Sequence, residues 1–482
     1  MTHKTLTLAI FAALLISSAC SDDQKTTAND TSPSSMDSGI EDEVDAPLPE
    51  DSGVDVAEDN DAAVDAILTT PVVEPECTDN RRPIVAAHGF LASGDTYTNH
   101  AMRFAANGYC LRSFYAFDWN SLDQGGVSAV DTLDTFIDAV LAESGATQVD
   151  LAGHSAGGGL GYQYLADPTR ASKVAHYAHI GSNAAEGPAG PEDAPTPTLN
   201  LWSQNDLIIA DRGDIEGANN VRLTVEDHYS VATSDASFEA IFTFFNDGEV
   251  PSPVDLSDPL ETVFVSGKAL SLGENTPVRE GTVEIFEVES ATGARQDPIA
   301  RFQTDANGHW GPFIASPDKH YEFKVQEDAL DSIPVHYYRE PFTRSNHLVY
   351  LRTLPSPDSF AGLVFSGIPF NEDTAVMIVF IASRALNENV DSLTVNGFEL
   401  ATTQLASPDQ TTIALFLYDG NSNGESDETV DSLFSSFPFL NAFDLAFPAG
   451  EDNTLSVNLN GRILNVPAWP AASDGATITV FN

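Results

Sequence analysis

Basic residues are scarce in this chain of 482 residues: 21 Lys and Arg stand against 72 Asp and Glu, a formal net charge of −51. Proteins that bind nucleic acid or an anionic membrane need a positive surface, so the charge balance argues against both partners. Solubility in salty surroundings is the simpler explanation of so many carboxylates. We therefore expect no nucleic-acid partner.

Long apolar runs are also missing. The run LTLAIFAALLI near the start is far shorter than the roughly 20 residues that span a bilayer, so we expect no transmembrane helix. It follows Lys4 and precedes SSAC, the pattern of a secretory signal over residues 1–20. The last four of these residues resemble a bacterial lipobox, which implies lipidation of Cys20. Leu is usual where Ser17 stands, so cleavage without lipidation stays an alternative.

Residues 21–76 have almost no aromatic side chains and a single basic residue, Lys25. Such a segment buries too little apolar surface to offset its ordering entropy, which predicts a disordered acidic tether; an interaction tail is the alternative. Together with an anchor at Cys20, it predicts an exported lipoprotein of the outer membrane or cell surface, attached to the membrane by its lipid. A periplasmic or secreted protein is the alternative.

Cysteine is rare as well, with three in the chain. Once Cys20 is assigned to the anchor, Cys77 and Cys110 are left in the folded part. An even remainder in an exported protein favours a disulfide between them, and two unrelated buried thiols are the alternative.

Residues 77–250 alternate between short apolar runs and segments of helical periodicity. In residues 129–145 the apolar side chains recur at helical spacing and Gly145 stands at the expected C-cap. Alternating strands and helices predict an α/β fold, a mostly parallel sheet with helices on both faces.

The stretch DLAGHSAGGG places Ser155 in a G-x-S-x-G motif between a buried strand and a helix. A serine on a tight strand-to-helix turn needs small neighbours, so we expect Gly153 and Gly157 to leave room for the turn and Gly158 and Gly159 to extend that room into the helix. Free N–H groups of the first helical turn would then face whatever Ser155 attacks.

The chain here resembles the α/β-hydrolase family, and within it the bacterial secreted lipases and esterases. The matching stretches are IVAAHGF, VDLAGHSAGG, KVAHYAHIGSNA, LWSQNDLII and GANNVRLTVEDHYSVATS. The resemblance implies a catalytic triad of nucleophile Ser155, carboxylate Asp206 and general base His228. The competing carboxylates are Asp211, Asp214 and Asp227, and a surface role is the alternative for His228.

The same resemblance implies an oxyanion hole formed by the backbone N–H groups of Phe90 and Ala156. We expect Phe90, Leu91, Leu207 and Ile208 to line an apolar substrate pocket, and the loop of residues 118–128 to contribute to it. The segment between the strands near 182 and 198 is short and Pro-rich, which predicts no large lid and an open site.

Beyond a linker near residue 250 the chain turns into β-rich runs separated by turn signals. They predict all-β C-terminal domains: a transthyretin-like β-sandwich over residues 257–352 and a second β-domain over 353–482, in which GLVFSG is one of the expected strands. This layout resembles lipases with a C-terminal β-barrel. Substrate docking or surface attachment is one role for this part, and packing against the hydrolase is the other.

The run DGNSNGESDETVD places Asp419, Asn421 and Asn423 at alternating positions before Gly424, like the start of a calcium loop. Val430 stands where the bidentate Glu belongs, so a polar hairpin turn is the alternative. We expect no catalytic metal and no required cofactor; a structural calcium ion is the one candidate.

Taken together, the sequence predicts a monomeric, exported serine ester hydrolase of the lipase or esterase type, acting on acyl esters or lipids. Two alternatives remain: a polyester depolymerase using the same triad, and a non-catalytic surface adhesin.

Overall fold

The computed structural model describes residues 72–74, 76–123, 128–256, 259–329, 332–437 and 439–482. All of them belong to one compact unit, residues 67–482. The predicted signal, Cys20 and nearly all of the predicted tether lie outside the described residues. At the described end of the tether, the carboxylate of Glu74 accepts hydrogen bonds at 2.7 and 2.8 Å from the guanidinium of Arg112. No described helix is long and apolar enough to cross a membrane.

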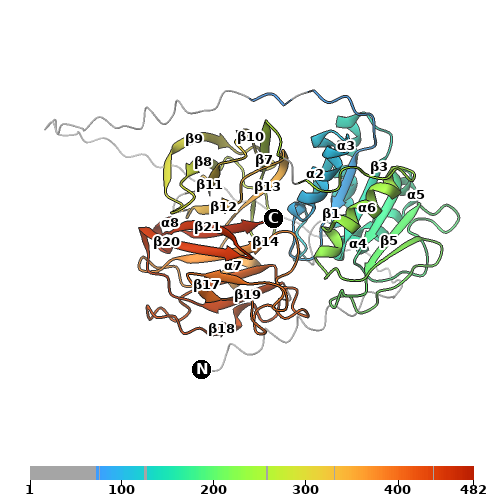
Figure 1. Cartoon of the computed structure of the whole chain (residues 1–482). Helices are drawn as coiled ribbons and strands as arrows, with labels where there is room; N and C mark the ends of the chain where they lie inside the picture. Colours follow the sequence, from blue (N-terminus) through green and yellow to red (C-terminus); the bar gives the residue numbers. More distant parts are fainter. Residues whose placement is uncertain (1–71, 75, 124–127, 257–258, 330–331, 438) are drawn as a thin grey trace, which may run out of the picture. The chain divides into compact units, whose positions relative to one another are not determined.

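Residues 76–256, the α/β half, contain a six-stranded parallel sheet in the order β2–β1–β3–β4–β5–β6 (Figure 1). The strands are β1 (Ile84–Ala87), β2 (Phe114–Phe117), β3 (Val149–His154), β4 (Val174–Ile180), β5 (Thr198–Ser203) and β6 (Asn219–Leu223). The helices are η3 (Gly94–Tyr97), α2 (Thr98–Ala106), η4 (Leu111–Ser113), α3 (Ala129–Ser144), α4 (Ala156–Leu165), α5 (Pro168–Ala171), η5 (Ser230–Ala232) and α6 (Asp235–Phe245).

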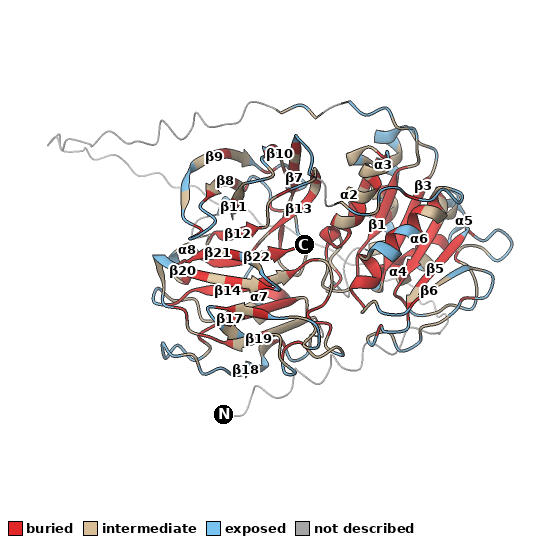
Figure 2. Ribbon diagram, viewed as in Figure 1, coloured by how far each residue is buried: buried red, intermediate tan, exposed pale blue. Residues whose placement is uncertain are grey.

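Both faces of this sheet are covered by helices, as the alternating pattern predicts. In β1, Ile84 and Ala86 join a core with α2 and α6, whereas Val85 and Ala87 join a second core with α3 and α4. Every residue of β1 is therefore buried, which explains its unbroken apolar run. Figure 2 shows the same burial in the strands of the sheet. Gly145 ends α3 in a left-handed conformation, with φ of 69°.

A disulfide joins Cys77 to Cys110, whose Cα atoms lie 5.6 Å apart. Cys110 directly precedes η4, which leads into β2. The bridge thus ties the start of the α/β half to the segment before its second strand, and the predicted pairing is confirmed.

Residues 259–482, the β half, form three further sheets. Their orders are β10–β7–β13, β18–β19–β17–β14–β22–β12–β11–β8–β9 and β16–β15–β20–β21. The strands are β7 (Val263–Ser271), β8 (Thr282–Val288), β9 (Arg295–Gln303), β10 (His309–Ala315), β11 (His320–Gln326), β12 (Val335–Arg339), β13 (Asn346–Thr353), β14 (Val376–Ile381), β15 (Leu393–Val395), β16 (Phe398–Glu399), β17 (Ala414–Tyr418), β18 (Val430–Asp431), β19 (Leu440–Asp444), β20 (Gly450–Leu459), β21 (Arg462–Ala468) and β22 (Ala476–Phe481), and the helices are α7 (Phe360–Phe365), η6 (Ser432–Phe434) and α8 (Ala471–Asp474).

The last strand, β22, joins the two predicted β-domains. It pairs in parallel with β12, which lies within predicted domain 257–352, and with β14, which lies within predicted domain 353–482. The nine-stranded sheet therefore crosses the predicted boundary at residues 352 and 353, and the two segments share one hydrophobic core.

The segment GLVFSG is not a strand, contrary to the sequence prediction. Residues Phe360–Phe365 form helix α7, capped by the hydroxyl of Ser359, which accepts a hydrogen bond from the N–H of Gly362 at 3.0 Å. A Cβ on Gly362 would lie 1.9 Å from the carbonyl oxygen of Ser356, so this turn also requires glycine. A short apolar run does not distinguish strand from helix, and here the cap decides.

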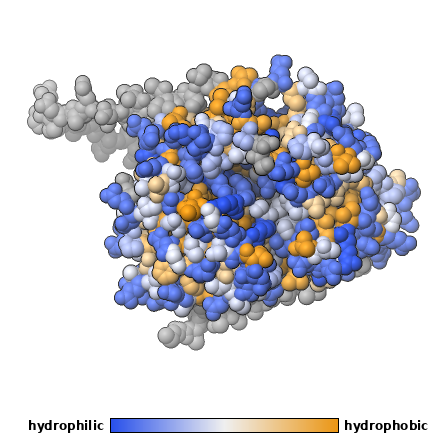
Figure 3. Space-filling view, viewed as in Figure 1, coloured by the Kyte–Doolittle hydropathy of each residue, from blue (hydrophilic) through white to orange (hydrophobic). Residues whose placement is uncertain are grey.

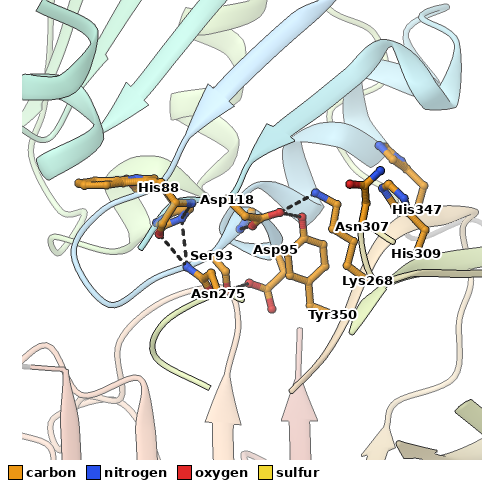
Figure 4. Close-up of polar contacts among 12 residues, drawn as sticks. His88, Ser93, Asp95, Asp118, Lys268, Asn275, Asn307, His309, His347 and Tyr350 are labelled. Carbon is orange, nitrogen blue, oxygen red and sulfur yellow. Dashed lines mark hydrogen bonds and ion pairs between the residues drawn. The ribbon is translucent and has the colours of Figure 1, made fainter. Parts of the chain in front are cut away.

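The β half packs directly on the α/β half through buried polar groups (Figure 4). The carboxylate of Asp118 pairs with the ammonium of Lys268 at 2.7 Å and accepts a hydrogen bond from the hydroxyl of Tyr350 at 2.8 Å. Burial alone would raise the pKa of Asp118, but Lys268 and the N–H of Gly94 hold it below its usual value. Arg352 pairs in the same way with Asp95 at 2.7 Å. Packing is therefore one role of the β half.

The outer surface is mostly hydrophilic on the face shown in Figure 3, with hydrophobic side chains in separate groups. This distribution agrees with the acidic composition of the chain.

Candidate functional site

Ser155 stands on the turn between β3 and α4, with φ of 54° and ψ of −119°. A positive φ is strained for a residue other than glycine, and its neighbours explain how the turn closes. A Cβ on Gly153 would lie 2.3 Å from the carbonyl oxygen of Gly157, and a Cβ on Gly157 would lie 2.3 Å from that of Ala87. Backbone atoms that cannot move aside therefore exclude any side chain at these two positions, as the sequence predicts.

The two glycines that follow differ from each other. A Cβ on Gly158 would lie 2.8 Å from the Cβ of Ser182, so this position also needs glycine. A Cβ on Gly159 would meet nothing within 4 Å. The expectation that Gly159 supplies necessary room is wrong, because this face of α4 looks into open space.

Ser155, His228 and Asp206 form one hydrogen-bonded chain. His228 Nε2 lies 3.1 Å from Ser155 Oγ, and His228 Nδ1 lies 2.8 Å from Asp206 Oδ2. The side chains of His228 and Asp206 are 2% and 1% exposed, whereas Ser155 is half-buried. Three residues separated by up to 73 positions in the chain thus meet at the ends of β3, β5 and β6.

Asp206 is held in place on its other oxygen. Oδ1 accepts hydrogen bonds from the backbone N–H groups of Ile208 at 2.9 Å and Ile209 at 3.2 Å. Burial alone would raise the pKa of Asp206, but the hydrogen bond and charge of His228, together with these two N–H groups, lower it. The carboxylate is therefore charged and oriented toward the ring of His228.

None of the three competing carboxylates bonds to His228 in the described part of the chain. Asp227 Oδ1 accepts hydrogen bonds from the N–H groups of Tyr229 at 2.8 Å and Ser230 at 2.9 Å, where η5 begins. Asp214 accepts the indole N–H of Trp202 at 2.9 Å, and the side chain of Asp211 is exposed. Among the carboxylates that the structure describes, Asp206 is the one bonded to His228.

His154 contacts both the backbone and the ring of His228, an interaction that the sequence did not predict. Its Nε2 lies 2.8 Å from the carbonyl oxygen of His228, and the two rings are 4.8 Å apart. Burial, reinforced by the neighbouring His228, lowers the pKa of His154 to about 3. A neutral His154 must carry its proton on Nε2 to donate to that carbonyl. Its position next to the nucleophile was the one available sequence signal.

Phe90 follows Gly89 in the loop after β1, and Ala156 follows Ser155 in the chain. A Cβ on Gly89 would lie 3.1 Å from the Cβ of Ser155, so the loop after β1 passes directly against the serine turn. Ala156 is the first residue of α4 and is exposed. Neither N–H donates to an acceptor within the described part of the chain, so both are available to an incoming group.

An apolar cavity of about 110 Å³, partly open to solvent, lies between the loop after β1 and the β half. Leu91 and Tyr229, the neighbours of Phe90 and His228, line it at one end. Its remaining walls come mainly from α7, β14, β17, η6 and β22, and Leu122 contributes from the loop after β2. The apolar side chains on these walls are Leu122, Val364, Phe365, Ile378, Phe416, Phe434, Ile478 and Val480.

Leu207 and Ile208 do not line this cavity. Leu207 is 50% exposed, and the N–H of Ile208 serves Asp206. Of the four predicted pocket residues, the cavity includes Leu91, while Phe90 lies next to it in the chain.

The segment between β4 and β5 forms no helix, as expected, and an aromatic ring of the β half lies against His228. The ring of Phe439 stacks on that of His228, with 5.8 Å between centroids and 15° between planes. This ring comes from the β half, more than 200 positions beyond His228 in the chain. The residues near His228 in the sequence therefore give no sign of it.

In the predicted calcium loop, side-chain oxygens accept hydrogen bonds from N–H groups of the loop itself. Asp419 accepts hydrogen bonds from the N–H groups of Asn423 at 3.1 Å and Gly424 at 2.7 Å, and the amide of Asn421 donates to Asp427 at 2.6 Å. No group of three or more His, Cys, Asp or Glu side chains that could hold a metal ion occurs among the residues described. These contacts are those of the polar turn that was the alternative.

Family models match three segments of the chain. Lipase (class 2) matches residues 81–166, the lipase C-terminal domain matches residues 261–355, and a third model, of a C-terminal domain, matches residues 382–482. The first segment contains Ser155 and the loop after β1. The chain thus contains one segment similar to class 2 lipases and a later segment similar to lipase C-terminal domains.

Solved structures similar to this chain include lipase B of Aspergillus fumigatus, with 14% identity and a TM-score of 0.29, over 41% of this chain and 59% of that one. The chain thus spans about three fifths of the Aspergillus enzyme. An esterase from Rhodococcus sp. ECU1013 has 15% identity and a TM-score of 0.28, over 36% and 93% of the chains. A monoacylglycerol lipase from Paleococcus ferrophilus has 16% identity and a TM-score of 0.26, over 34% and 95%.

The contrast between Gly157 and Gly159 gives a matched test of the serine turn. Gly157→Ala should destabilise the hydrolase by at least ~2 kcal/mol and abolish activity, because its Cβ meets backbone atoms of β1. Gly159→Ala should keep full activity and raise the free energy of unfolding by up to about 1 kcal/mol, the helix propensity difference. Urea unfolding and ester hydrolysis of both variants measure this. Equal effects at the two positions would contradict the assignment.

The lowered pKa of His154 predicts a loss of stability in acid. The unfolded histidine binds a proton near its ordinary value of 6.5, whereas the folded one binds it near 3, so its contribution is complete above pH 6.5 and is lost as the pH falls toward 3. Between pH 7 and pH 5 the loss should be roughly 2 kcal/mol. His154→Gln keeps a donor for the carbonyl of His228 and cannot titrate. Chemical denaturation at both pH values should show a smaller drop in this variant, and an unchanged drop would refute it.

Proposed function

We propose that the hydrolase cleaves acyl esters through a covalent acyl-enzyme at Ser155. His228 takes the proton of Ser155 Oγ as that oxygen attacks the ester carbonyl, and the tetrahedral oxyanion accepts hydrogen bonds from the N–H groups of Phe90 and Ala156. His228 then gives its proton to the departing alcohol as the ester C–O bond breaks. Water then attacks the carbonyl of the acyl-enzyme, with His228 again taking the proton. This step releases the carboxylic acid and restores Ser155. The hydrogen-bonded chain Ser155–His228–Asp206 is the observation that carries this proposal.

Asp206 stays ionised throughout this cycle. Its carboxylate holds the proton of His228 on Nδ1, so that Nε2 faces Ser155 as an acceptor, and its charge stabilises the imidazolium that forms. The two backbone N–H groups on Oδ1 prevent the carboxylate from turning away.

The cavity favours lipid-like acyl chains over the alternatives. A small apolar cavity lined by Leu91 and Tyr229 suits one flexible acyl chain, whereas a polyester chain needs a groove that is open at both ends. We therefore propose that the acyl chain enters the cavity from Leu91 and Tyr229 and extends toward β17 and β22. The family models favour the ester hydrolase over the adhesin alternative.

Export and lipidation at Cys20 also remain proposals, supported by the pattern of residues 1–20 alone. The anchor would hold a monomeric hydrolase at the outer membrane or cell surface, near lipid substrates.

Ser155→Ala should abolish turnover with the fold intact, because the hydroxyl lies on a half-buried turn outside the cores. A fluorophosphonate probe should label the unmodified chain at Ser155 and leave this variant unlabelled. Asp206→Asn should lower kcat by about 10³-fold or more, since the amide disturbs the His228 tautomer. Asp211→Asn and Asp214→Asn serve as matched controls with near-normal rates. Labelling at a different serine would refute the mechanism.

Filling the cavity should shorten the acyl chains that the hydrolase accepts. Ala414, on β17, lines the cavity and is 6% exposed. In Ala414→Phe, kcat/KM for p-nitrophenyl palmitate should fall at least tenfold, while that for p-nitrophenyl acetate should stay within about twofold. Leu207→Ser is the control, because Leu207 lies outside the cavity. If the control loses long-chain activity and Ala414→Phe does not, the acyl chain lies along Leu207 instead.

A further inference from the structure

Asn275 reaches from the β half into the α/β half beside the proposed oxyanion hole. It lies in the turn after β7, with φ of 57°, and is 7% exposed. Its amide nitrogen Nδ2 lies 2.8 Å from the carbonyl oxygen of Ala92, 3.1 Å from that of Trp119 and 3.3 Å from Nε2 of His88. Figure 4 shows its side chain pointing at His88. One amide of the β half thus contacts the loop after β1 at two positions, His88 and Ala92.

These contacts determine which nitrogen of His88 carries the proton. Nε2 faces two donors, the amide of Asn275 and the backbone N–H of Trp119 at 3.1 Å, so it must be the acceptor. The proton of the neutral ring is then on Nδ1, which donates to the carbonyl oxygen of Gly89 at 2.8 Å. Burial lowers the pKa of His88, which agrees with a neutral ring.

The carbonyl of Gly89 belongs to the same peptide unit as the N–H of Phe90. Because that unit is planar, a hydrogen bond to the carbonyl oxygen also sets the direction of the N–H. The N–H of Ala92 donates to the same oxygen at 3.3 Å, and the carbonyl of Ala92 in turn accepts from Asn275. Asn275 therefore acts on the orientation of the Phe90 N–H through both His88 and Ala92.

We propose that Asn275 is a positioning residue for the oxyanion donor of Phe90, so that the β half controls the rate of the chemical step as well as covering the site. This inference rests on the proposed function, in which Phe90 donates to the oxyanion. A packing contact would change stability alone, whereas a positioning residue changes the stabilisation of the transition state more than the binding of substrate.

Two variants of the full chain test this role. Asn275→Asp keeps the shape but replaces the donor with an acceptor, and Asn275→Gly removes the side chain while tolerating the left-handed backbone. With p-nitrophenyl butyrate, kcat per Ser155 labelled by a fluorophosphonate should fall about tenfold or more in both, and KM should stay within about twofold. Complete loss of one oxyanion donor costs about 10²–10³-fold, which sets the upper limit. The dissociation constant of an alkylboronic acid, which mimics the tetrahedral state, should rise by a similar factor.

Thr98→Val is the matched control, because the hydroxyl of Thr98 donates across the same interface to the carbonyl of Leu348 at 3.2 Å, on the α2 side of the contact. It should leave kcat and the boronic acid affinity unchanged. Undiminished kcat in both Asn275 variants, or an equal fall in Thr98→Val, would overturn the role of Asn275 while the mechanism stands. A lack of fluorophosphonate labelling at Ser155 in the unmodified chain would overturn the proposed function, and the role of Asn275 with it.

Discussion

The close approach of α4 to the end of β1 is the contact on which the site depends. With Cβ atoms absent from Gly153 and Gly157, the first turn of α4 lies against the carbonyls of Ala87 and His88. This approach leaves Ser155 in a strained conformation and directs it toward His228. It also brings the loop after β1 within contact distance of the serine. The nucleophile and one proposed oxyanion donor are therefore positioned by the same packing, and neither can shift alone.

Buried charges make the two halves one unit. Asp118 and Asp95 of the α/β half pair with Lys268 and Arg352 of the β half. Removing one partner would leave an uncompensated buried charge, which costs much more than an exposed ion pair contributes. Leu270, Leu348 and Tyr350 of the β half belong to the same core as α2 and α6. The β half is accordingly part of the structure around the active site and not an appended module.

Local patterns in the sequence predicted the features that local physics determines. The parallel sheet and the bounds of α3 follow from short runs and turn residues, and the disulfide follows from the number of cysteines. The choice of Asp206 and His228 as partners of Ser155 came from the resemblance to a known family. The features that sequence missed depend on distant contacts. The cover of Phe439 over His228, the role of Asn275 and the sheet joined by β22 each link segments that lie far apart in the chain. Helix α7 was missed for a different reason, since its serine cap outweighs an apolar run that is equally typical of a strand.

The place of β22 in the nine-stranded sheet has a consequence for the order of folding. In the described sheet, strands β8, β9, β11 and β12 on one side and β14, β17, β18 and β19 on the other are linked by hydrogen bonding through residues 476–481. During synthesis, the ribosome makes these residues after every other strand of that sheet. Until then, the edges of β12 and β14 that face β22 stay unpaired. Completion of the sheet is thus a late, long-range event. Since the cavity is walled by β14, β17 and β22, it can form only after that event, and a partly made chain lacks the proposed acyl site.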